Sequence, residues 1–181
     1  MNKSKQQSGF TVIEIVVAAG IFAMIALLYV TNFKSFAQGR AVESNADKIA
    51  ANIRQAQIWT LTGELAPSGS RPYGYGINID SPCTSGTCTY KVFADTCNPT
   101  NHVYDNGCDT IVSTEPLDAL VSVASVSPSG PLTLLFTMPG ADIYTNTTAA
   151  QSASITLSHR AVSNKTKVVS IDGVSGQVNV Q

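Results

Sequence analysis

Two hydrophobic patterns follow one another in the first third of the chain. Residues 10–33 are apolar at nearly every position, and Glu14 is the one residue among them that is charged at neutral pH. Over residues 34–63 apolar side chains recur every three or four positions among polar ones, as on a helix with one buried face. This stripe consists of Val42, Ala46, Ile49, Ile53, Ala56 and Thr60. The two patterns predict a helix over 10–63, and Gly63 is a natural residue for its end.

The apolar run is long enough to cross a membrane. The 21 residues that begin at Phe10 would extend ~32 Å as a helix, against a hydrocarbon core of about 30 Å. We therefore predict a transmembrane segment over 10–33 and an amphipathic segment over 34–63 that docks on the protein's own sheet. A secretory signal peptide cleaved near Ala37-Gln38-Gly39 is an alternative, although its apolar region would be about 7–15 residues long. A plain signal anchor would explain the length but not Glu14.

Residues 64–181 consist of short alternating runs separated by turn residues. Tyr73, Tyr75, Ile77 and Ile79 alternate with small or polar residues, which is typical of a strand. Further strands are predicted around Tyr90–Ala94, Thr110–Ser113, Leu120–Val126, Leu132–Met138, Ala153–Ser158, Val168–Ile171 and Val174–Val180. Such a series indicates an antiparallel sandwich or rolled sheet. The predicted fold class is α+β, with a long N-terminal helix packed against a β-rich head of residues 64–181.

The four cysteines lie close together in the head. Cys83, Cys88, Cys97 and Cys108 are separated by gaps that lack the paired C-x2-C spacing of a zinc site. Downstream of a membrane-targeting segment, an even number of cysteines predicts two disulfides in an oxidising compartment. Of the three possible pairings, the most local joins Cys83 to Cys88 and Cys97 to Cys108, and it closes its loops at the least entropic cost.

A transmembrane segment over residues 10–33 must accommodate the charged side chain of Glu14. A carboxylate near the bilayer centre costs about 2.5–3.5 kcal/mol on insertion scales. Since Glu14 lies one turn inside the apolar run, it could reach the interface or interact with the helix dipole. Alternatively, its partner is a cation on another molecule, such as a freed amino group on Phe10 of a neighbouring chain.

The segment Gly9-Phe10-Thr11-Val12-Ile13-Glu14, after a short basic leader and before further apolar residues, resembles the processing site of type IV pilins and type II secretion pseudopilins. The resemblance implies that prepilin peptidase removes residues 1–9 by cutting after Gly9. It implies that the new N-terminal Phe10 is methylated and that Glu14 directs assembly by pairing with the N-terminus of an adjacent subunit. The implied partners are other pilin or pseudopilin subunits and an inner-membrane assembly platform. The implied location is the inner membrane, with an extracytoplasmic head, and then a pilus or pseudopilus.

The C-terminal third resembles the head of FimT/GspH-type minor pilins and pseudopilins. The residues that carry this resemblance are Leu134–Gly140, Ser154–Leu157, Val168–Ile171 and Gly176–Val180. Some FimT-like members serve DNA uptake through a basic C-terminal region, which makes a DNA-binding minor pilin the alternative function. Here the basic cluster is His159, Arg160, Lys165 and Lys167, and the tail after Gly176 contains no arginine. A solvated hairpin tip is the plainer interpretation of this cluster.

The overall charge also speaks against a general attraction to nucleic acid. The formal net charge is −1, and Lys3 and Lys5 would leave with the leader. The mature chain would therefore be more acidic still, which disfavours DNA as a partner.

We expect no enzymatic activity. His102 and His159 are the only histidines, and no zinc-protease, nucleophile-elbow or phosphate-loop motif is present in the sequence. Both histidines are expected to be solvated loop and strand residues. No cofactor is expected, although the oxygen-rich segment from Asp95 to Asp109 leaves calcium open as a possibility. The acidic and amide residues of this segment are not spaced as the calcium ligands of an EF-hand loop are.

Overall fold

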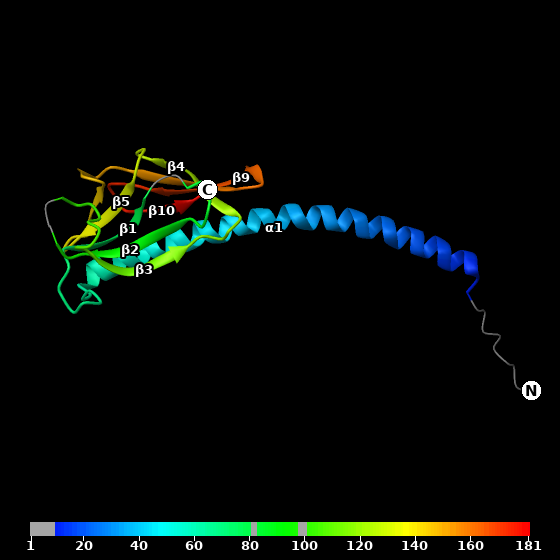
Figure 1. Cartoon of the computed structure of the whole chain (residues 1–181), viewed down its shortest axis with the longest axis horizontal. Helices are drawn as coiled ribbons and strands as arrows, with labels where there is room; N and C mark the ends of the chain where they lie inside the picture. Colours follow the sequence, from blue (N-terminus) through cyan, green and yellow to red (C-terminus); the bar gives the residue numbers. More distant parts are fainter. Residues whose placement is uncertain (1–9, 81–82, 98–100) are drawn as a thin grey trace, which may run out of the picture. The chain divides into compact units, whose positions relative to one another are not determined.

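The computed structural model describes residues 10–80, 83–97 and 101–181. It forms two compact units, one that ends at Ala37 and one that comprises Gln38–Gln181. Helix α1 (Val12–Thr62) contributes residues to both units (Figure 1). The α+β class predicted from the sequence is confirmed, because α1 is followed by strands that pair only in antiparallel fashion.

The first unit is the apolar part of α1. Val12–Tyr29 has a mean hydropathy of 2.5, and none of this stretch is buried within the protein. By length and composition this segment can cross a membrane.

The second unit contains two antiparallel sheets. The six-stranded sheet has the order β3-β2-β1-β5-β6-β7, and the four-stranded sheet has the order β10-β9-β8-β4. The strands are β1 (Gly74–Ile79), β2 (Thr89–Asp95), β3 (Thr110–Pro116), β4 (Val121–Ser127), β5 (Leu132–Thr137), β6 (Asp142–Thr145), β7 (Thr148–Ala149), β8 (Ala153–His159), β9 (Val162–Ile171) and β10 (Val178–Val180).

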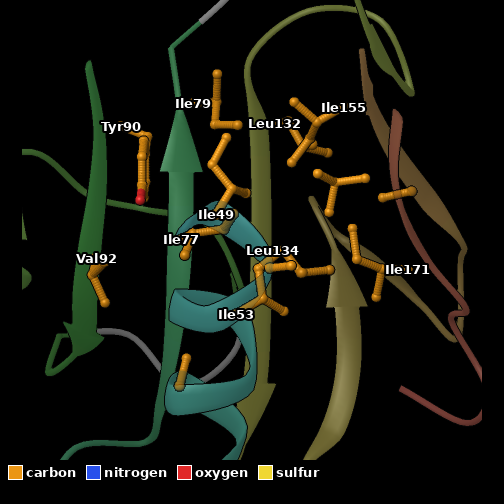
Figure 2. Close-up of a cluster of buried hydrophobic side chains, with 14 of the residues drawn as sticks. Ile49, Ile53, Ile77, Ile79, Tyr90, Val92, Leu132, Leu134, Ile155 and Ile171 are labelled. Atoms are coloured by element: carbon orange, nitrogen blue, oxygen red, sulfur yellow. The ribbon is translucent and has the colours of Figure 1, made fainter. Parts of the chain in front are cut away.

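The second half of α1 is part of the core of this unit. All six residues of the predicted stripe, from Val42 to Thr60, are buried. Figure 2 shows Ile49 and Ile53 beside Ile77 of β1 and Leu134 of β5. Ile155 and Ile171 of the four-stranded sheet belong to the same cluster. The predicted docking of the amphipathic segment on the protein's own sheet is therefore confirmed, and the compact unit begins at Gln38 rather than at residue 64.

The outer face of the six-stranded sheet is also covered. Phe93 of β2 and Leu135 of β5 are fully buried, yet they lie outside the main core cluster. The ring of Tyr104 packs against that of Phe93 at 5.2 Å, and the ring of His102 stacks on that of Tyr144 at 3.7 Å. The loop before β3 thus acts as a cover, so β1 is buried at all six positions rather than at alternate ones.

Several sequence predictions need correction. Strand β9 begins at Val162, six residues before the predicted start, because β8 and β9 form a tight hairpin. The last strand covers only Val178–Val180, since the preceding residues form a turn. In that turn the Asp172 carboxylate accepts hydrogen bonds from the Ser175 and Val174 N–H groups, and these bonds hold the pKa of Asp172 below its usual value.

The close approach of β1 to β5 gives a prediction about Gly76. A Cβ at this position would overlap the carbonyl oxygen of Leu134 on the neighbouring strand. We expect Gly76→Ala to lower the free energy of unfolding by about 1–3 kcal/mol, the usual cost of overpacking. Gly39→Ala is the control, because its Cβ would meet nothing within 4 Å, and alanine at a helical position should stabilise by up to about 1 kcal/mol. Thermal unfolding followed by circular dichroism would measure both, and equal effects would contradict the packing argument.

Candidate assembly and processing site

The start of α1 is a capping box made by Thr11 and Glu14. The Thr11 backbone N–H and its hydroxyl each donate a hydrogen bond to Oε2 of Glu14, both at 2.9 Å. In return the Glu14 N–H lies 3.4 Å from Oγ1 of Thr11. Helices leave their first N–H groups without backbone partners, and the pattern T-x-x-E satisfies them reciprocally. The sequence therefore fixes where the helix begins, at Val12, directly after the capping residue Thr11.

The capping box changes the interpretation of Glu14. In a single chain its carboxylate already has a partner three residues away, so the helix end alone can explain why a glutamate is tolerated here. Both bonds from Thr11 use Oε2, and the cap leaves Oε1 for another donor. The side chain is exposed, which makes that second oxygen accessible to a group from outside the chain.

Phe10 and the residues after it present an apolar surface without cover. The Phe10 side chain is 85% exposed, and most large apolar residues of the first unit are exposed as well. These include Val12, Ile13, Ile15, Val16, Val17, Ile21, Phe22, Met24, Ile25, Leu27, Leu28 and Tyr29. A continuous apolar surface of this size requires lipid or other helices around it. The predicted leader, residues 1–9 with Gly9, lies outside the described residues.

The head contains the two disulfides of the most local pairing. Cys83 is bonded to Cys88 and Cys97 to Cys108, with Cα–Cα distances of 5.7 and 5.8 Å. Both separations are ordinary for a disulfide. The second bond closes the loop that covers Phe93, and the first holds the segment before β2.

The oxygen-rich loop uses its carboxylates internally. Asp109 accepts hydrogen bonds from the N–H groups of Thr96 at 3.1 Å and Asp105 at 2.7 Å. The Asp105 carboxylate in turn accepts one from the side chain of Asn101. Within residues 10–80, 83–97 and 101–181, no group of three or more His, Cys, Asp or Glu side chains is arranged to hold a metal ion. Asn98, which belongs to the predicted oxygen-rich segment, lies outside these residues.

The residues of the predicted basic cluster differ in burial and in their contacts. His159 is 2% exposed and its Nδ1 accepts a hydrogen bond from the Ala161 N–H, so the expectation of a solvated histidine is wrong. Arg160, in the β8–β9 turn, donates from Nε to the carbonyl of Val121 at 3.2 Å and from Nη2 to the carbonyl of Gly86. Lys165 and Lys167 are half-buried positions of β9. Arg160 is therefore engaged with the protein's own backbone.

Sequence reasoning missed two of these contacts. The T-x-x-E pattern of Thr11 and Glu14 is a sequence signal for the capping role of Thr11. The contact between Arg160 and the Cys83–Cys88 loop joins residues more than 70 positions apart and has no signal in the local sequence.

Comparison with known proteins identifies the N-terminal segment. Residues 4–30 match the family model of the prokaryotic N-terminal methylation motif. No curated protein and no solved structure matches the chain. The match covers residues 4–9 of the predicted leader, Phe10, the capping box and most of the apolar segment over 10–33. By this motif the chain is a type IV pilin-like or pseudopilin-like protein.

Proposed function

We propose that the chain is a structural subunit of a type IV pilus or of a type II secretion pseudopilus, of the FimT/GspH minor type. Prepilin peptidase would cut after Gly9, and the mature subunit would enter the filament through the first half of α1. The observation that carries this proposal is the start of α1. Within the residues that match the methylation motif, a glutamate with one accessible oxygen lies in the first turn of an uncovered apolar helix.

The head fits a building block better than an enzyme or a DNA-binding module. Its buried cluster joins the second half of α1 to both sheets, so this part of the helix and the strands share one core. The two disulfides favour an extracytoplasmic location for the head, with the first half of α1 in the inner membrane before assembly. DNA is disfavoured because Arg160, the only arginine of the basic cluster, is bonded to carbonyls of the head.

The mass of the mature N-terminus tests this function most directly. In cells that contain prepilin peptidase, we expect a chain that begins at methylated Phe10. Cells without the peptidase should retain the chain that begins at Met1, which serves as the matched control. A chain that begins at Arg40 would instead show a secretory signal peptide, and an uncut chain in both cells would show a plain anchor.

A further inference from the structure

The two disulfides lie in opposite electrostatic surroundings. Nη2 of Arg160 donates a hydrogen bond to Sγ of Cys88 at 3.2 Å. The other disulfide has acidic groups near it: the Cys97 N–H donates to Asp95 Oδ1 at 3.4 Å, and Asp109 directly follows Cys108 in the chain. A guanidinium stabilises a thiolate next to it, whereas nearby carboxylates oppose one. The charge around each bond therefore makes Cys83–Cys88 the easier one to open.

The Arg160 guanidinium is fixed in place rather than resting on the disulfide by chance. Its Nε bonds to the Val121 carbonyl, its Nη2 bonds to the Gly86 carbonyl inside the disulfide loop, and its backbone N–H bonds to the Leu120 carbonyl at 2.8 Å. Gly86 lies between the two cysteines in the chain. The hydrogen bonds of Arg160 therefore connect its guanidinium both to the disulfide loop and to β4. Because the guanidinium is already held next to Sγ of Cys88, it does not have to move when a negative charge develops on that sulfur.

The two sulfurs also differ in access. Cys88 is 2% exposed, and its carbonyl accepts the Leu117 N–H at 2.9 Å. Cys83 is half-buried and pairs through its backbone with Val123 of β4, at 3.0 and 3.1 Å. Cys83 is therefore more accessible to an attacking group than Cys88. The more accessible sulfur belongs to Cys83, and the sulfur beside the Arg160 guanidinium belongs to Cys88. This difference gives thiol–disulfide exchange a defined direction, with attack on Cys83 and departure of Cys88.

We propose that Cys83–Cys88 is a site of directed thiol–disulfide exchange, with Arg160 as its catalytic residue. An external thiolate attacks Sγ of Cys83 and forms a mixed disulfide with it. The bond to Cys88 breaks, and Cys88 leaves as a thiolate that the Arg160 guanidinium stabilises. A second external thiolate then attacks the sulfur of the first reagent molecule in the mixed disulfide. This step releases Cys83 as a thiolate and the oxidised reagent, so two electrons pass from two thiols to the protein disulfide. By reversal, Cys88 is the thiolate that closes the bond during oxidative folding.

The experiment follows both disulfides in the same full-length protein in detergent. Reduced glutathione is the probe, and acid quenching, alkylation and peptide mass spectrometry report the fraction of each bond that remains. In the native chain we expect Cys83–Cys88 to open first, with glutathione trapped on Cys83. Arg160→Gln should slow the opening of this bond about tenfold, because the leaving thiolate loses its cation. Arg160→Lys should recover most of the rate, and the Cys97–Cys108 rate should stay constant throughout.

If Arg160→Gln acted only by loosening the fold, it would not slow the opening of Cys83–Cys88. If Arg160 only held the hairpin in place, its loss would expose Cys88, and Cys83–Cys88 would open faster or at an unchanged rate. That result would overturn the proposal, as would glutathione trapped on Cys88 or an equal slowing of both disulfides. The position of the trapped glutathione is read from the native chain, so the proposal remains testable even if Arg160→Gln folds poorly.

Discussion

Replacing Glu14 by Gln is expected to lower incorporation into filaments at least tenfold without disturbing the start of α1. Glutamine can take the same place in a capping box, since its side-chain oxygen also accepts the Thr11 N–H bond seen for Glu14 at 2.9 Å. What it lacks is the negative charge that the proposed pairing with a neighbour's Phe10 amino group requires. Truncating one partner of a desolvated charge pair costs about 2–5 kcal/mol, and each 1.4 kcal/mol is about a factor of ten.

The control for this prediction is Thr11→Val, which keeps the charge and removes the hydroxyl that contacts Glu14. Loss of a cap costs about 1 kcal/mol in helix stability. The apolar helix would remain stable in the membrane, so we expect incorporation close to that of the native chain. The measurement is the ratio of subunit in sheared filaments to subunit in the membrane. If Thr11→Val reduced this ratio as much as Glu14→Gln, the role of Glu14 would be local capping and not intersubunit pairing.

The strongest sequence patterns predicted the corresponding structure, because the physics behind them is local. The period of the stripe from Val42 to Thr60 identified the buried face of α1 without knowledge of what it packs against. The pairing of Cys83 with Cys88 and of Cys97 with Cys108 followed from loop length alone. Alternation in β8 also continues to its end, since Ala153, Ile155, Leu157 and His159 are all buried. The expectation that His159 is solvated is wrong, because its position in the alternation of β8 places it on the buried face.

The features that were missed depend on contacts that no local pattern encodes. Strand β6 has four residues and β7 has two, which is too short for a period to be read. The first half of β9 is polar and is a strand because β8 lies beside it, with Ser158 opposite Thr166. The cover over Phe93 is a loop whose Tyr104 packs on the sheet. In each case tertiary pairing decides the structure where local propensity is weak.

A fragment of residues 38–181 is expected to fold, whereas a fragment of residues 64–181 is not. The first contains the whole compact unit. The second lacks the helix whose buried face includes Val42, Ile49 and Ile53. Burying one large aliphatic side chain contributes about 1.5–3 kcal/mol, so these three alone represent roughly 5–9 kcal/mol. That amount is comparable with the whole stability of a typical domain, about 5–15 kcal/mol.

Polar contacts would be lost together with the apolar ones. Arg54 donates to the Val178 carbonyl at 2.8 Å, Gln57 to the Gly176 carbonyl at 2.7 Å, and Asn52 to the Tyr90 hydroxyl at 2.7 Å. Without α1 these acceptors would face solvent beside an uncovered apolar surface. We therefore expect the 64–181 fragment to give no cooperative thermal transition and to bind a hydrophobic dye. A cooperative transition in this fragment would show that the head has a core of its own.

Single substitutions in the 38–181 fragment separate burial from the mere presence of the helix. Ile53→Ala removes a fully buried side chain and should cost about 2–5 kcal/mol, since a cavity is left between α1 and β5. Ile58→Ala is the matched control on the same helix, because Ile58 is 51% exposed. Its effect should stay within about 0.5 kcal/mol, as for other surface positions. Chemical denaturation of both variants gives the two values. Similar losses would mean that α1 contributes through its helical conformation and not through the buried stripe, and the boundary at Gln38 would then have no basis in packing.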